Sequence, residues 1–188
     1  MYVTTSERLT MEGAKKMMAT AVEQATKAGI AVSIAITDAG GHLILFERME
    51  GGRFHSVHSS TAKAVCAASN KRMTSARGAQ GQELDVMHAL GLTLAAGPER
   101  WTAMEGGCPV IADGECIGGI GVSGGDWETD ARIAREAISS IGAPRSCIAM
   151  SSDIWSWTNR VCFWGSDGTV RWDGSMKRRT LNGTCCSC

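Results

Sequence analysis

The sequence predicts an α/β fold of the α+β type, in which helices pack on a five-stranded antiparallel sheet. Three observations lead to this prediction: a helical period over residues 6–28, Asp-Gly turns between apolar runs, and a final amphipathic stretch that follows a glycine-rich run. Hairpin turns dominate the connections between the expected strands. An antiparallel sheet covered by helices is therefore the simplest architecture for this chain.

The N-terminal third is predicted to form a helix followed by a β-hairpin. Apolar residues recur every three or four positions over residues 6–28, and Gly29 stands where a glycine commonly ends a helix. Residues 30–36 and 42–48 are rich in apolar side chains. They flank the turn of residues 38–41, whose Asp and Gly favour a tight reversal of the chain.

The remaining elements alternate between helices and strands. The alanine-rich residues 59–70 and the shorter residues 83–90 are expected to be helical, with a polar loop at 74–82 between them. The last helix should run to about residue 141, with Asp126 as its N-cap. Three further strands are expected over residues 100–104, 110–112 and 116–122.

Composition limits the classes of function. With 188 residues the chain suits one domain, and formal net charge is zero, which gives no electrostatic basis for binding nucleic acid or a membrane surface. No segment has the roughly 20 apolar residues that cross a bilayer, and the N-terminus lacks the apolar core of a secretory signal. A cytoplasmic protein without nucleic-acid or membrane partners is the expectation.

The eight cysteines do not form a metal-binding pattern. None of them stands in a paired Cys-x-x-Cys arrangement, and five of the eight fall in the last 44 residues. The sequence therefore predicts no structural metal site.

Three segments in register carry a family resemblance. They are residues 35–51, with Asp-Ala-Gly-Gly followed by Glu-Arg-Met-Glu-Gly; residues 60–64, Ser-Thr-Ala-Lys-Ala; and residues 105–124, from Glu-Gly-Gly-Cys-Pro-Val to Gly-Val-Ser-Gly. In order and spacing this chain resembles the GlcG/HbpS-like family, which includes the C-terminal domain of PduO-type adenosyltransferases. The match covers roughly residues 6–143.

The resemblance implies a profilin-like layered fold, a homo-oligomer (dimer, tetramer or octamer) and binding of a small molecule. Some members of the family bind and degrade haem, so the resemblance makes haem or a related tetrapyrrole the suggested cofactor. Other members accompany the catabolism of glycolate, propanediol or aromatic compounds. The family thus implies the fold more firmly than the function.

A group of charged residues around the second predicted helix is the first candidate site. Arg48 ends a strand, Glu50 opens a glycine-rich loop, and Lys63 is a cation within an alanine-rich helix. Arginine and lysine both hold carboxylates, and loops at strand ends commonly carry binding sites. The alternative is that Arg48 and Glu50 form a pair at the surface or between subunits.

Two histidines are candidate ligands. His55 and His58 are three positions apart, so they would share one face if the second helix began early. That spacing suits a haem iron, although loop histidines are more often simply solvated. His42 and His88 offer no such pairing.

The glycine-rich run at residues 118–125 is the third candidate. It leads from a strand to a helix N-terminus, where free N–H groups and the helix dipole favour an anion, so Ser123, Gly124 and Gly125 are candidate binding residues. It lacks the Lys-Ser/Thr of a phosphate-binding P-loop. The alternative is that these glycines let a strand and a helix pack closely.

Two functional hypotheses follow. The first is a small-molecule-binding protein for haem or a related tetrapyrrole. The second is a catabolic hydrolase, tautomerase or decarboxylase for a small unsaturated or halogenated carboxylic acid, with Arg48 and Lys63 holding carboxylates and Glu50 or Asp126 moving a proton. A third hypothesis is an accessory subunit with no ligand of its own.

The tail beyond residue 143 differs from the rest in composition. Residues 144–188 contain four of the six tryptophans and carry six Lys or Arg against three Asp, a net charge of +3. Residues 161–165 and 169–172 flank Ser-Asp-Gly, which favours a hairpin. A disordered tail, a non-native read-through and a strap over a neighbouring subunit stay open as interpretations.

Overall fold

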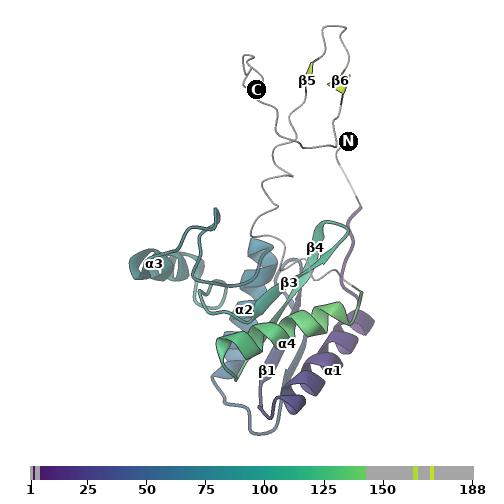
Figure 1. Cartoon of the computed structure of the whole chain (residues 1–188), viewed down its shortest axis with the longest axis vertical. Helices are drawn as coiled ribbons and strands as arrows, with labels where there is room; N and C mark the ends of the chain where they lie inside the picture. The colour runs from purple at the N-terminus through teal and green to yellow at the C-terminus, as the bar shows by residue number, and fades with distance from the viewer. Residues whose placement is uncertain (1, 3–4, 143–162, 165–169, 172–188) are drawn as a thin grey trace, which may run out of the picture. The chain divides into compact units, whose positions relative to one another are not determined.

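The computed structural model describes residue 2, residues 5–142, and two short strands at 163–164 and 170–171. Residues 5–142 belong to one compact unit, and residues 153–188 to a second. Figure 1 shows the arrangement of the elements. In the first unit these are α1 (Met11–Lys27), β1 (Ser33–Asp38), β2 (Leu43–Arg48), α2 (Ser56–Asn70), α3 (Val86–Ala96), β3 (Gly107–Ala112), β4 (Glu115–Ser123) and α4 (Trp127–Ser139).

The four strands form one antiparallel sheet in the order β2-β1-β4-β3. The prediction of an α+β fold with an antiparallel sheet is therefore confirmed. At one end of the sheet Ser33 of β1 lies opposite Arg48 of β2 on one side and opposite Ser123 of β4 on the other. Residues directly opposite each other in antiparallel strands point to the same face, so these three side chains share one face.

One face of the sheet packs against α1 and α4 and forms the main hydrophobic core (Figure 1). The inward side chains are alanine and methionine on α1 and alanine and isoleucine on α4, and the sheet contributes alternate positions of β1 and β4. The fully buried members include Met17, Ile34, Ile36, Ile120 and Ile133. Alternation along the strands places these residues on one face, as a half-buried sheet requires.

The other face of the sheet is covered by α2, which packs on β1, β3 and β4. Small residues make this layer thin. A Cβ atom at Gly119 would collide with the backbone carbonyl of Ala64, and one at Gly121 with that of Ser60. These two glycines allow the α2 backbone to lie directly on β4. The interpretation that glycines of the 118–125 run serve close packing is thus supported at Gly119 and Gly121.

The five-strand count is not confirmed, because residues 100–104 are not a strand. Gly97 ends α3 with φ of 94°, and its carbonyl accepts hydrogen bonds from the N–H groups of Arg100 and Trp101. The N–H of Met104 donates to Oγ1 of Thr102. Since these N–H groups bond to the nearby residues Gly97 and Thr102 and not to a neighbouring strand, residues 100–104 add no fifth strand to the sheet.

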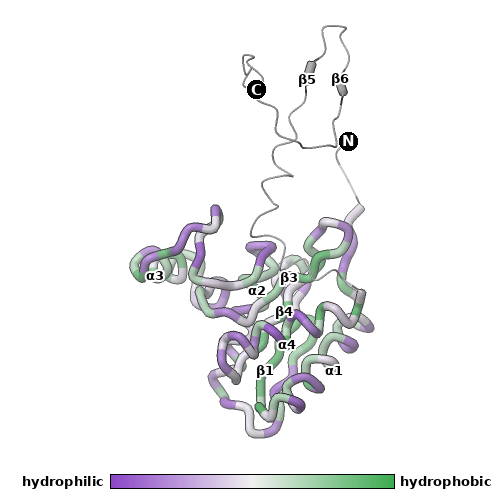
Figure 2. The backbone as a smooth tube through the Cα atoms, in the orientation of Figure 1, coloured by the Kyte–Doolittle hydropathy of each residue, from purple (hydrophilic) through white to green (hydrophobic). Residues whose placement is uncertain are grey.

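The helix α3 differs from the predicted one in position and in surroundings. It begins at Val86 because Asp85 caps it by accepting a hydrogen bond from the N–H of His88 at 2.9 Å. None of its eleven residues is buried and none is charged. Figure 2 shows it as a largely hydrophobic segment that projects from the sheet and its covering helices.

In the second unit, β5 (Phe163–Trp164) and β6 (Val170–Arg171) pair as antiparallel strands. The residues predicted to form the turn between them, and the other interpretations of the tail, lie outside the described residues. The predicted boundary at residue 143 stays a prediction.

Candidate functional site

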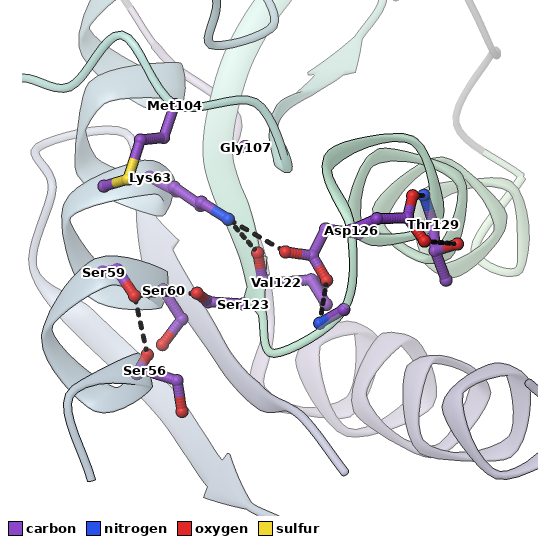
Figure 3. Close-up of polar contacts among 12 residues, drawn as sticks. Ser56, Ser59, Ser60, Lys63, Met104, Gly107, Val122, Ser123, Asp126 and Thr129 are labelled. Atoms are coloured by element: carbon purple, nitrogen blue, oxygen red, sulfur yellow. Dashed lines mark hydrogen bonds and ion pairs between the residues drawn. The ribbon is translucent and has the colours of Figure 1, made fainter. Parts of the chain in front are cut away.

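The N-terminal half of α2 meets the row of strand ends formed by Arg48, Ser33 and Ser123. The hydroxyl of Ser33 lies 2.8 Å from that of Ser56 on α2. The hydroxyl of Ser123 lies 2.7 Å from that of Ser59, a contact shown in Figure 3. We call this group of five residues the serine row: Ser33, Ser56, Ser59 and Ser123, with Arg48 beside them. They bring together three distant parts of the sequence, and the exposed Arg48 stands at the edge of the group.

His55 and His58 lie beside the serine row. The helix α2 begins at Ser56, earlier than predicted, so His55 is its N-cap and His58 is in its first turn. Both side chains are exposed, and the exposed ring of Phe54 meets the His55 ring edge to face, with centroids 5.7 Å apart. The spacing of three places the two imidazoles on neighbouring positions of one helix.

The four histidines of the chain fall into two classes. The Nδ1 atom of His42 lies 3.2 Å from a carboxylate oxygen of Asp38, and that of His88 lies 2.7 Å from one of Asp85. Among the described residues no hydrogen bond or ion pair engages the ring of His55 or His58. These two imidazoles therefore keep their ring nitrogens available for a ligand.

Lys63 is engaged by the protein itself. Its side chain, 5% exposed, donates from Nζ to the carbonyl oxygen of Val122 at 2.8 Å (Figure 3). The same Nζ donates to Oδ2 of Asp130 at 3.0 Å. The Asp130 side chain is 3% exposed. A buried charge needs such a partner, because an unpaired one is very costly to remove from water. The carboxylate that Lys63 binds is thus an internal one, and its role in holding a substrate carboxylate stays a prediction.

Asp130 also fills the anion position predicted at the glycine-rich run. Its Oδ1 accepts a hydrogen bond from the backbone N–H of Gly125 at 3.0 Å. Gly124 adopts φ of 151°, and a Cβ atom there would approach the carbonyl of Ala31 to 2.6 Å. The N–H of Gly125 is thus bonded to an internal carboxylate from α4, and ligand binding by Ser123, Gly124 and Gly125 stays a prediction.

Asp126 and Glu50 do not join this group. The carboxylate of Asp126 caps α4 by accepting bonds from the backbone N–H of Thr129 at 2.9 Å and from its hydroxyl at 2.8 Å. These bonds, the backbone one foremost, lower the pKa of Asp126, which makes its carboxylate a weaker base. Its predicted N-cap position is confirmed. Glu50 is exposed in the turn after β2.

A separate hollow of about 510 Å³ lies along α4. None of the residues singled out as site candidates lines it. Its walls are formed by Met73, Glu105, Trp127, Glu128, Thr129, Ala131, Arg132 and Arg135. It combines a large exposed aromatic ring with charges of both signs.

Two arrangements were missed from the sequence. The Lys63–Asp130 pair had a signal, because Lys63 is the only Lys, Arg, Asp or Glu in α2 and a cation among alanines requires a partner. The hollow had none, since residues 73, 105 and 127–135 meet only through the folding of the chain. Within the described residues no three His, Cys, Asp or Glu side chains gather as a metal site, and no helix has the length and apolarity to cross a membrane.

Comparison with known proteins agrees with this architecture. Protein GlcG of Escherichia coli (strain K12) is 36% identical over 115 residues, which cover 61% of this chain and 81% of GlcG. The crystal structure of Klebsiella pneumoniae protein ORFY superposes with a TM-score of 0.66 and 32% identity, covering 77% of this chain and 98% of that one. The structure of a PduOC:heme complex superposes with a TM-score of 0.64 and 28% identity, covering 74% and 99%.

The family model of "Haem degrading protein HbpS-like" matches residues 9–139. That span takes in α1 through α4, and with them the sheet, the serine row and the Lys63–Asp130 pair. The chain therefore belongs to the HbpS-like family.

Proposed function

We propose that this protein binds haem or a related tetrapyrrole, with His55 and His58 as the candidate iron ligands. The observation that carries the proposal is that these two imidazoles are exposed, lie on neighbouring helical positions and form no hydrogen bond or ion pair within the described part of the chain. Imidazole is a common axial ligand of haem iron. The similarity to the PduOC:heme complex and to the haem-degrading family supports the same ligand class.

The surroundings of the histidines suit the rest of such a ligand. The exposed Phe54 ring offers an apolar surface next to His55, and Arg48 offers a bidentate fork for a propionate carboxylate. Ser59 and Ser123 add hydroxyl groups that donate or accept. Bound haem would supply an iron centre for redox or oxygen chemistry, and the protein would supply ligands and orientation.

A haemin titration followed by Soret absorbance tests the proposal. The wild-type chain is expected to shift the Soret band saturably, and the variant His55→Ala/His58→Ala is expected to lose most of that shift. The variant His42→Ala/His88→Ala is the matched control, because it also removes two exposed imidazoles. No saturable shift in the wild type, or equal shifts in both double variants, would refute the assignment.

The catabolic alternative receives less support from these positions. Lys63 is committed to Asp130, and the carboxylate of Asp126 is occupied in capping α4. A substrate carboxylate could reach Lys63 only by displacing a buried internal one. The exposed Arg48 and Glu50 remain as groups that such an enzyme would use.

We further propose that the chain forms a homo-oligomer through α3. Val86, Met87, Leu90 and Leu94 form one stripe of this helix and are between 49% and 81% exposed. A short helix with no buried face is marginal in water, so the stripe needs a cover. A second copy suits it, because a stripe without charges meets its own image across a two-fold axis with no repulsion.

Light scattering after size-exclusion chromatography tests this assembly. Leu90→Ser is expected to lower the measured mass toward that of the monomer, because it places a hydroxyl in the middle of the stripe. Leu43→Ser, at a similarly exposed apolar residue of the sheet edge, is the control and should leave the mass unchanged. A wild-type chain that is monomeric, or a mass insensitive to Leu90→Ser, would contradict the proposal.

A further inference from the structure

The hollow along α4 carries two positive and two negative side chains. Glu128, Arg132 and Arg135 come from α4, where spacings of four and three place them on one face. Glu105 comes from the segment before β3. The four formal charges cancel, so the lining as a whole favours neither a cation nor an anion.

These four charged side chains form no ion pairs with one another. Glu128 and Arg132 have the i,i+4 spacing that pairs readily on a helix, and Glu23 and Lys27 form such a pair on α1 at 2.6 Å. Among the described residues, neither Arg132 nor Arg135 forms an ion pair with a carboxylate. Both guanidinium groups and both carboxylates are therefore available to a third molecule in the hollow.

The apolar part of the lining is a flat ring with a flexible neighbour. Trp127 is 60% exposed, although it is among the side chains that proteins most often cover. Met73 from the loop after α2 is half-buried and contributes a polarisable thioether. A volume of about 510 Å³ falls in the range of small-molecule sites.

We propose that this hollow binds a small zwitterionic amino acid with an aromatic side chain. Its carboxylate would lie against Arg132 and Arg135, and its ammonium against Glu105 and Glu128. Its ring would stack on Trp127 beside Met73. A simple carboxylic acid would face two carboxylates and a simple amine would face two guanidiniums, whereas a molecule with both charges is complementary to the whole lining. The site is independent of the proposed haem ligands.

Three probes with the same ring separate the contributions. L-Phenylalanine carries both charges, 3-phenylpropanoate only the carboxylate, and 2-phenylethylamine only the ammonium. Isothermal titration of the full chain should give the tightest binding for phenylalanine, with each single-charge probe weaker by about tenfold, the effect of one lost charge-assisted contact. The ranking of the three affinities for the wild-type chain tests the proposal even if a variant fails to fold.

Matched variants then assign each charge. Arg135→Ala should weaken the binding of phenylalanine and of phenylpropanoate by roughly tenfold and leave that of phenylethylamine unchanged. Glu105→Gln should weaken the binding of phenylalanine and of phenylethylamine by roughly tenfold and leave that of phenylpropanoate unchanged. Arg100→Ala and Glu99→Gln alter exposed charges outside the hollow and should change none of the three.

Equal or tighter binding of phenylpropanoate than of phenylalanine would overturn the proposal in favour of a plain carboxylate site. Absence of binding by all three probes would overturn it outright. Repeating the phenylalanine titration in saturating haemin distinguishes this site from the haem site. Unchanged affinity is the expected result, and loss of phenylalanine binding would mean that the two ligands share one place.

Discussion

The two helices α2 and α3 follow one another in the chain and are opposite in their surroundings. Eight residues of α2 are buried, although its apolar side chains are mostly alanine. The helix α3 carries larger apolar side chains and buries none of them. A helix is buried where the sheet offers a matching surface, and for α2 that surface is the glycine-lined face of β4. The hydrophobicity of a helix alone does not determine whether it is buried against the sheet.

Charge follows the same division. The one ionised side chain of α2 is enclosed and given a partner by α4, whereas α3 has no charge and its neighbour Asp85 stays at the surface. Contacts within the chain fix the position of α2, whereas the apolar side chains of α3 need a second surface to bury them. The predictions below test that contrast, beginning with the largest effect.

Removing the cation of α2 should have the largest effect. Lys63→Met leaves Asp130 buried without its partner, and we expect a loss of about 3–5 kcal/mol in the free energy of unfolding. Urea denaturation followed by circular dichroism measures it. Lys16→Met, at an exposed lysine of α1, is the control and should cost less than about 0.5 kcal/mol. A similar small loss for Lys63→Met would mean that Asp130 finds water or another partner.

The close contact of α2 with β4 predicts the next effect. In Gly121→Ala the added methyl group meets the backbone of Ser60, so the helix must move away, at a cost of about 1–3 kcal/mol. The matched change in α3 is Gly91→Ala, where a Cβ atom meets nothing within 4 Å. Helix propensity should make that variant neutral or more stable by up to about 1 kcal/mol. Equal losses at both positions would remove the contrast between the helices.

The difference between local and tertiary contacts also explains which parts of the fold could be predicted from the sequence. The hairpin of β1 and β2, the cap at Asp126 and the order of helices depend on local signals, and local signals were enough for the class of fold. The prediction of a strand at residues 100–104 was wrong, because its N–H groups bond to nearby residues of the same stretch of chain, Gly97 and Thr102. Apolar composition could not distinguish such a turn from a strand.

The candidate site was predictable in its residue types and less so in its pairings. Arg48 was expected near the second helix and Ser123 at the start of the last one, and the register of the sheet places both side chains on the face that α2 covers. The partner of Lys63 could not be predicted, because Asp130 is 67 positions away and reaches it only through the packing of α4. The hollow along α4 depends in the same way on tertiary structure.

Acid should loosen α3 before α2. The bonds from the backbone and side chain of His88 lower the pKa of Asp85, so the capping contribution is present above the ordinary aspartate pKa and is lost as pH falls through the lowered value. Hydrogen exchange, corrected for the slower intrinsic exchange at low pH, should then show lower protection factors for the α3 amides. Asp85→Asn keeps the cap oxygen without a titrating group and should abolish this pH dependence. Parallel changes in α2 would show a global transition instead.

The smallest expected effect concerns a large apolar side chain. Leu94 is 72% exposed, so Leu94→Ala should change the free energy of unfolding by no more than about 0.5 kcal/mol at high dilution. Ile133→Ala in the core, where the side chain is fully buried, should cost about 2–5 kcal/mol in the same measurement. If a second copy covers α3, the cost of Leu94→Ala should rise with protein concentration, because the assembled state then contributes to stability. A large cost at every concentration would mean that the chain itself buries Leu94, and the contrast between α2 and α3 would no longer hold.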